Sequence, residues 1–295
     1  INVHTDGSVT ITGTPIIDFS SSNLASTEAN NTKFTMDGGR LILGTAELLP
    51  NMGGVYKITG GTIEFSNNAD RIRTPNTFNN IEISVPAGKQ VTYAGGNLTL
   101  NPNSTVLVKP NATLTSTNGN ASLVGTSNNT LKLEPDATFR TAVIPGFYGP
   151  AASGLNPSPS VRNNITLDLD PGSIVEYARL SGSGGLPAGA LSGEQQIVPL
   201  ANGYPNLQIT GNGTKTVMGN VVVNNSTSVT SGSATLEIQE TADTESSSVL
   251  TAKKGVRVIY GQAIFKNNAQ LMQDVDAVNV GSIKVERTLK PRRKD

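Results

Sequence analysis

Cysteine and tryptophan are absent from the 295 residues, and histidine occurs only once, at His4. Without cysteine the chain can form no disulfide, no thiolate metal site and no cysteine nucleophile. A catalytic triad would depend on His4, which has neither a nucleophile motif nor metal-ligand spacing near it. We therefore expect no chemical role for His4 and no enzyme activity.

Net charge and long apolar runs are lacking as well. Lys plus Arg and Asp plus Glu both number 22, so the overall charge favours neither a nucleic acid nor an acidic membrane as partner. No segment approaches the roughly 20 apolar residues that span a bilayer, so we expect no membrane-spanning helix. Residues 1–12 lack the basic start and apolar run of a signal peptide. If the protein is exported, we expect its signal to have been removed or to lie outside the given residues.

A sequence repeat runs through the segment 97–139, where short alternating apolar runs are separated by turn residues. Alternation predicts strands in which Val106 and Val108 face inward while Leu107 and Lys132 face outward. A fixed spacing lets each strand lie on its counterpart one repeat earlier, which is typical of a coiled parallel sheet. Large apolar residues recur 25 positions apart in these pairs: Ile81 and Val106, Leu98 and Leu123, Val106 and Leu131, Leu114 and Phe139.

The turns repeat together with the strands. Proline in P-N-S-T, P-N-A-T and P-D-A-T sets the backbone angle φ at a corner. The residue that follows it, Asn103, Asn111 or Asp136, tolerates the left-handed conformation that a sharp corner requires. The seven Asn-Asn pairs are explained by the same corner chemistry, although glycan contacts are an alternative.

These patterns predict an all-β fold, a right-handed parallel β-helix with coils of about 25 residues. We expect this β-solenoid to cover residues 1–289, with 290–295 as the start of a basic, solvated linker to a following domain. Val258 and Ile283 are 25 positions apart and are expected to continue the register. Segments 144–163 and 181–194, rich in proline or glycine, are predicted to protrude as loops.

Asp168 and Asp170 are the candidate metal ligands. Alternation in ITLDLD places them on one side of a strand, with Glu176 and Arg179 following soon after. β-Helix lyases and glycosidases carry acidic residues with Arg or Lys on one sheet face, often with calcium. A solvated strand face is the first interpretation here, and a Ca²⁺ site or a catalytic site is the alternative. No other cofactor is expected.

Phe147 and Tyr148 are the candidate binding residues, because both fall in the proline-rich segment 144–163. Sugar binding generally uses exposed aromatic rings for stacking. The chain has only six Tyr and seven Phe, many of them at strand positions. We therefore expect any ligand to contact the protruding loops.

A short module occurs twice, as an aromatic residue followed by N-[IL]-x-I, at Phe78–Ile83 and at Tyr204–Ile209. A G-[TS]-I motif precedes each copy, and a Gly-Asn strand, GGNLTL or MGNVVV, follows it. Together with the closing stretch Ala277–Asp295, this module resembles the repeat region of large secreted, adhesin-like surface proteins of the Bacteroidota. The resemblance implies export by the type IX secretion pathway and a place outside the cell or on the bacterial cell surface.

We therefore expect a noncatalytic, adhesin-like β-solenoid stalk that displays binding loops and functions in cell adhesion. Its expected partners are a host surface, matrix or glycan ligand, and protein neighbours at the coil ends. Two alternatives remain open: a carbohydrate-active β-helix enzyme, either a polysaccharide lyase or a glycosidase, and a subunit that self-assembles into filaments. An enzyme needs a cleft with convergent charged residues on one face, whereas a stalk does not.

Overall fold

The computed structural model describes the following residues: 2–3, 8–19, 25–26, 33–44, 56–66, 71–73, 76–94, 96–117, 121–150, 158–180, 193–239 and 248–287. In these ranges the regular structure consists of β-strands, with no helix, and therefore none that could cross a membrane. The all-β prediction is confirmed. Contacts divide the chain into two compact units on either side of Val175 and Glu176, within β20 (Ile174–Tyr177). A single domain over 1–289 stays a prediction, and 290–295 lies outside the described residues.

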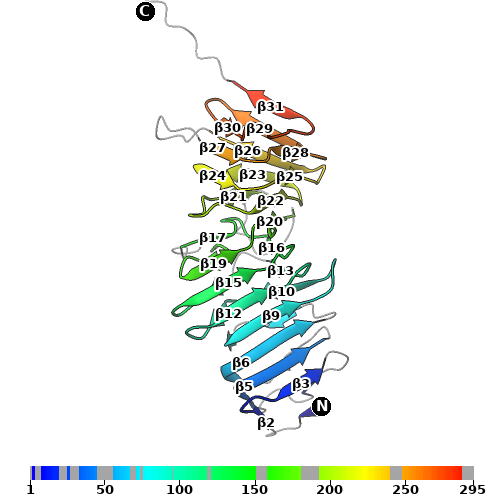
Figure 1. Ribbon diagram of the computed structural model, residues 1–295, viewed down its shortest axis with the longest axis vertical. Helices are drawn as coiled ribbons and strands as arrows, with labels where there is room; N and C mark the ends of the chain where they lie inside the picture. Colours follow the sequence, from blue (N-terminus) through cyan, green and yellow to red (C-terminus); the bar gives the residue numbers. More distant parts are fainter. Residues whose placement is uncertain are drawn as a thin grey trace, which may run out of the picture. The chain divides into compact units, whose positions relative to one another are not determined.

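The first unit contains three parallel sheets and a separate strand pair, and successive strands can be followed by colour in Figure 1. Sheet I consists of β2 (Ser8–Ile11), β3 (Ile16–Phe19), β5 (Lys33–Leu43), β6 (Tyr56–Ser66), β9 (Asn80–Ser84), β12 (Thr105–Val108), β15 (Asn129–Leu133) and β19 (Ile165–Leu169). Sheet II contains β7 (Arg71–Arg73), β10 (Gln90–Ala94), β13 (Thr113–Ser116) and β16 (Thr138–Thr141). Sheet III contains β8 (Asn76–Phe78), β11 (Leu98–Leu100), β14 (Leu123–Val124), β17 (Tyr148–Gly149) and β18 (Val161–Arg162). The strand pair is β1 (Asn2–Val3) and β4 (Ala25–Ser26).

From β8 to β16 the chain enters sheets III, I and II in turn and passes through that order three times. Val106 pairs with Ile81 on one side and with Leu131 on the other, each 25 positions away, so the predicted register is confirmed here. Leu98 likewise pairs with Leu123. The next step is longer, since Leu131 pairs with Leu167, 36 positions on.

Alternation along the strands separates a buried face from an outer face. Val106, Val108 and Leu131 are fully buried, whereas Lys132 is exposed, as the period of two predicts. Burial of these aliphatic rows in water-excluded layers is the main stabilising contribution to such a fold.

The corners of the first unit have the predicted backbone conformation. Asn103, Asn111 and Asp136 have φ of 61°, 63° and 61°, in the left-handed region. Asn128 has φ of 53°, and its side-chain amide donates to Asn103 Oδ1 at 3.1 Å. Equivalent corners therefore stack on one another. This contact explains the consecutive pair Asn128-Asn129 without a ligand.

The second unit is also built from parallel strands, which we describe within this unit as sheets IV, V and VI; the strands of V belong to the same hydrogen-bonded sheet as β20. Sheet IV contains β21 (Gln195–Ile197), β23 (Gly213–Val217), β26 (Ala234–Ile238), β29 (Gln262–Lys266) and β31 (Ile283–Glu286). Sheet V contains β22 (Asn206–Ile209), β25 (Thr227–Val229) and β28 (Val256–Val258). Sheet VI contains β24 (Asn220–Val223), β27 (Val249–Ala252) and β30 (Gln270–Met272).

The register of the second unit differs from that of the first and is shorter at several steps. Gly213 pairs with Ala234, 21 positions on, and Ala263 pairs with Ile283, 20 positions on. The expected pairing of Val258 with Ile283 is therefore wrong. The Val258 N–H instead donates to the Val280 carbonyl at 2.7 Å. At these steps the turns contain fewer residues than the proline corners of the first unit. Three successive strands therefore take up fewer residues before the chain returns to the same sheet.

Candidate functional site

Asp168 and Asp170 lie at β19 but act separately. Asp168 is exposed on the outer face of sheet I, with Oδ2 3.1 Å from the Lys132 ammonium. Asp170 stabilises the turn that follows, because its Oδ1 accepts the Gly172 N–H at 2.7 Å and its carbonyl accepts the Ser173 hydroxyl. Within the described ranges, no group of three or more His, Asp or Glu side chains could hold a metal ion. The Ca²⁺ hypothesis therefore obtains no ligand set from this part of the chain.

Phe147 is not exposed, and the exposure expected for it is wrong. Its side chain is fully buried, and its ring lies edge to face against Phe139, with centroids 4.9 Å apart. The cause is that 144–163 is not all loop: it contains β17 and β18, which pair with each other, while 151–157 lies outside the described residues.

Tyr148, next to Phe147, is partly exposed, and its hydroxyl lies 3.1 Å from the Asn163 carbonyl and 3.2 Å from that of Ile165. Partial desolvation raises the pKa of this phenol. The two aromatic residues thus do not form one exposed stacking surface.

Glu176 and Arg179 also differ from expectation. Both are buried, with 5% and 2% of their surface exposed, so they do not extend the outer face that carries Asp168. The Thr210 hydroxyl donates to Glu176 Oε1 at 2.6 Å, within the second unit. The catalytic interpretation, which needs these groups on the same accessible face as Asp168, is not supported at these positions.

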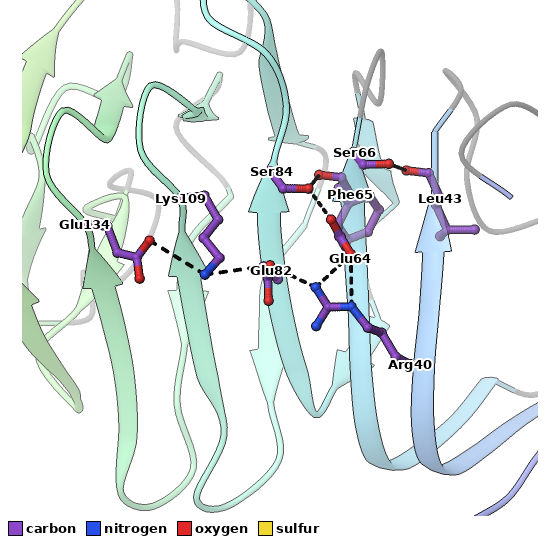
Figure 2. Close-up of polar contacts among 9 residues, drawn as sticks. All are labelled: Arg40, Leu43, Glu64, Phe65, Ser66, Glu82, Ser84, Lys109 and Glu134. Atoms are coloured by element: carbon purple, nitrogen blue, oxygen red, sulfur yellow. Dashed lines mark hydrogen bonds and ion pairs between the residues drawn. The ribbon is translucent and has the colours of Figure 1, made fainter. Parts of the chain in front are cut away.

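Charged residues that the sequence did not single out meet on the outer face of sheet I, as Figure 2 shows. We call this set the charged row; its members are Arg40, Glu64, Glu82, Lys109 and Glu134. Five different strands or strand ends supply them, from β5 to the end of β15. Parallel register brings these residues together, because side chains on one face of neighbouring strands lie about 4.8 Å apart.

Glu64 and Glu82 occupy directly paired positions on β6 and β9. Like charges placed opposite each other destabilise a sheet. Arg40 offsets this repulsion, because Nη2 lies 2.7 Å from Glu64 Oε2 and 2.8 Å from Glu82 Oε1. Its Nε also donates to Glu64 Oε2 at 3.0 Å. The hydrogen bond to Glu82, followed by the contacts with Glu64, raises the pKa of the Arg40 guanidinium.

The row continues through Lys109 and is bordered by hydroxyl groups. Lys109 Nζ lies 4.0 Å from Glu82 Oε1 and 3.7 Å from Glu134 Oε2. Ser84 donates to the second oxygen of Glu64, and Ser66 donates to the Leu43 carbonyl at 3.3 Å (Figure 2). Each carboxylate in the row therefore faces a cation.

Two signals in the sequence point to this row. Glu64 and Glu82 share the local pattern I-E in GTIEF and NIEI, and Lys109 and Glu134 lie 25 positions apart, each before a proline. Neither signal shows that the four side chains are neighbours until the register of β6 against β9 is known. In that register Glu64 and Glu82, which pair, are only 18 positions apart.

Arg40→Gln should destabilise the first unit by about 1–2 kcal/mol, because it leaves two partly buried carboxylates opposite each other without a bridging cation. Adding Glu82→Gln should restore part of the lost stability, because it removes the repulsion between Glu64 and Glu82. The measurement is urea unfolding of the single and double variants. As control, Lys132→Gln breaks the exposed pair with Asp168 and should cost less. Equal losses for Arg40→Gln and Lys132→Gln would show that the bridging geometry contributes nothing.

His4 and the basic residues at 290–294 lie outside the described residues, as does most of the predicted loop 181–194. In the residues that the structure describes, the candidate features are the ion-paired outer face of sheet I and the buried polar contacts. No family model matches the chain, and neither a curated protein nor a solved structure is found to be similar to it.

Proposed function

We propose that this chain is a right-handed parallel β-helix that acts as a noncatalytic structural stalk outside the cell or on a bacterial cell surface. The successive entry of the chain into three parallel sheets supports the β-helix. Each strand then lies on a strand one coil earlier. The resemblance of the repeated N-[IL]-x-I module and of the closing stretch to surface proteins of the Bacteroidota supports the location and type IX export.

The observation that carries the stalk proposal is the charged row. A β-helix glycosidase or lyase needs an acid and a base that are available to the substrate. Here Glu64 and Glu82 are shared by Arg40, and Lys109 lies between Glu82 and Glu134. Carboxylates engaged by cations on neighbouring strands stabilise the sheet, and the side chains of Glu64 and Glu82 are only 13% exposed, which limits the access of a substrate to them. The row thus supports a structural role for this face.

In this proposal, ligand contacts are made by the segments 144–163 and 181–194, because loops carry variable contacts while strands position them. A host surface, a matrix component or a glycan is the class of partner that an adhesin-like stalk would hold. Deleting 151–157 and 181–192 one at a time and measuring adhesion to cells and immobilised glycans tests this assignment. If both deletions leave all measured adhesion intact, the loops are not the contact sites.

The purified protein should leave pectin, alginate and chondroitin intact during long incubation with Ca²⁺, because the outer-face carboxylates are ion-paired. Product release is followed by reducing-end assay and by absorbance of unsaturated sugars. The matched variants are Glu64→Gln with Glu82→Gln, and Asp168→Asn with Asp170→Asn. Cleavage by the parent protein that disappears in either double variant would favour the carbohydrate-active enzyme.

A further inference from the structure

β31 is the last strand of sheet IV, and among the described strands it has a pairing partner on one side only. It lies parallel to β29, with Ile283 opposite Ala263 and Val285 opposite Phe265. β30 and β28 are likewise the terminal strands of sheets VI and V. An open sheet edge carries N–H and C=O groups that can pair with a further strand. The edge of β31 is therefore available for such a strand.

Exposed apolar side chains gather in the stretch of chain that ends with β31. Of the ten large hydrophobic side chains that are exposed in the described residues, seven lie between Ile259 and Val285. Val285 is 59% exposed, whereas its partner Phe265 on β29 is 4% exposed. Leu271 on β30 is half-buried, whereas its partner Leu250 is fully buried. The last strands thus expose positions that the preceding strands bury, and a gathering of exposed apolar groups marks an interaction site.

The backbone of β31 determines which groups face the open edge. The Glu286 carbonyl accepts the Asn267 N–H at 2.7 Å, so the backbone groups of Glu286 face β29. Successive residues of a strand direct their N–H and C=O groups to opposite sides. The N–H and C=O of Val285 therefore face the open edge. A residue with this orientation can exchange both hydrogen bonds with one residue of an antiparallel strand.

The charges on β31 are complementary to those of an antiparallel copy of itself. Lys284 and Glu286 flank Val285, with Nζ and Oε1 2.5 Å apart and with 62% and 39% of their side chains exposed. If two copies pair with Val285 opposite Val285, then Lys284 of each lies opposite Glu286 of the other. Opposite charges at such positions stabilise a sheet, and like charges destabilise it. An edge with a single sign of charge would repel its copy, whereas this edge attracts it.

We propose that β31 is a dimerisation edge, at which two copies of this chain pair antiparallel about a two-fold axis at Val285. The occupant is a second copy because one strand supplies the hydrogen-bonding groups, the apolar centre and both charges. A two-fold contact of this kind is closed, so it produces a dimer and not a filament. The proposal rests on the geometry of the second unit and is independent of the proposed stalk function.

Sedimentation equilibrium of the chain over a range of protein concentrations tests the proposal. The parent protein should be a dimer. Lys284→Glu places glutamates opposite each other at both symmetric positions, and Glu286→Lys does the same with lysines. Each variant should raise the dissociation constant of the dimer by about tenfold or more. Because both side chains are exposed, the circular dichroism spectra of the variants should match that of the parent.

An equimolar mixture of Lys284→Glu and Glu286→Lys separates charge matching from a general effect of substitution. Together the two variants restore opposite charges at both positions, so they should form a heterodimer. Val285→Pro is a second test, because it removes the N–H that faces the open edge and leaves the groups that bind β29. This variant should not dimerise. If it does not fold, the charge variants decide the outcome.

A parent protein that stays monomeric at every concentration would overturn the proposal. Lys284→Glu or folded Val285→Pro dimers as tight as those of the parent would overturn it too, as would a mixture of the charge variants that forms no heterodimer. Parent assemblies that keep growing with concentration would indicate a head-to-tail contact and contradict the closed dimer.

Discussion

Replacing Leu131 with aspartate should unfold the part of the first unit around β15, at a cost of about 4 kcal/mol or more. Leu131 is fully buried and pairs with Val106 on one side and Leu167 on the other. A carboxylate at this position would face aliphatic rows with no cation or N–H donor to compensate it. Urea unfolding followed by circular dichroism measures the loss.

Lys132→Gln is the matched control for Leu131→Asp, because it changes the next residue on the same strand. Lys132 is exposed and pairs with exposed Asp168, so its replacement should cost at most about 1 kcal/mol. The contrast tests which face of β15 is buried. Comparable losses for the two variants would contradict the assignment of buried and outer faces.

Asn129→Ala should destabilise the first unit by about 3 kcal/mol or more. The Asn129 side chain is fully buried and holds four backbone groups. Its amide donates to the carbonyls of Asn101, at 2.6 Å, and Ser104, at 3.3 Å. Its oxygen accepts the N–H groups of Thr126, at 2.7 Å, and Ser127, at 3.0 Å. Alanine would leave these groups without their partner at the corner where residues 101–104 lie against residues 126–129.

Ser127→Ala provides the control for Asn129→Ala, because it lies on the same corner and its side chain is exposed. Its backbone N–H still donates to Asn129, so the stability should change by less than about 0.5 kcal/mol. Thermal unfolding of both variants is the measurement. A loss in Ser127→Ala as large as that in Asn129→Ala would show that the corner is sensitive to any change, and not to the four hydrogen bonds.

The parallel register of β9, β12 and β15, of β11 with β14 and of β13 with β16 could be predicted because apolar residues and corner residues repeat there at the same interval. Val106 and Leu131 pair as expected, and Asn103 and Asn128 stack as equivalent corners. The second unit could not be predicted in this way. Its paired residues lie 20 or 21 positions apart in places, whereas Leu236 and Ala263 are 27 positions apart. Turn length varies there, and no proline marks the turns between residues 206 and 286.

Burial of single residues was harder to predict than the register. Composition assigned Phe147 to an exposed loop, but its contact with Phe139 depends on a strand pairing that the local sequence does not show. Lys215 was not singled out from the sequence, although alternation places it on the same side as buried Val217, and its ammonium donates to the carbonyls of Arg179 and Asn212. Its partners are backbone carbonyls, which have no signature in the sequence.

The strand pairings within each unit also determine how the chain reaches its folded state. The paired residues of the described strands are separated by 13 to 38 positions, from Tyr148 with Val161 to Leu123 with Val161. Closing a loop costs free energy that grows only with the logarithm of its length, so these pairings have nearly equal entropic costs. No strand pair of this set joins distant parts of the sequence. Each strand within a unit can therefore pair with its earlier neighbour as soon as about 40 further residues have left the ribosome.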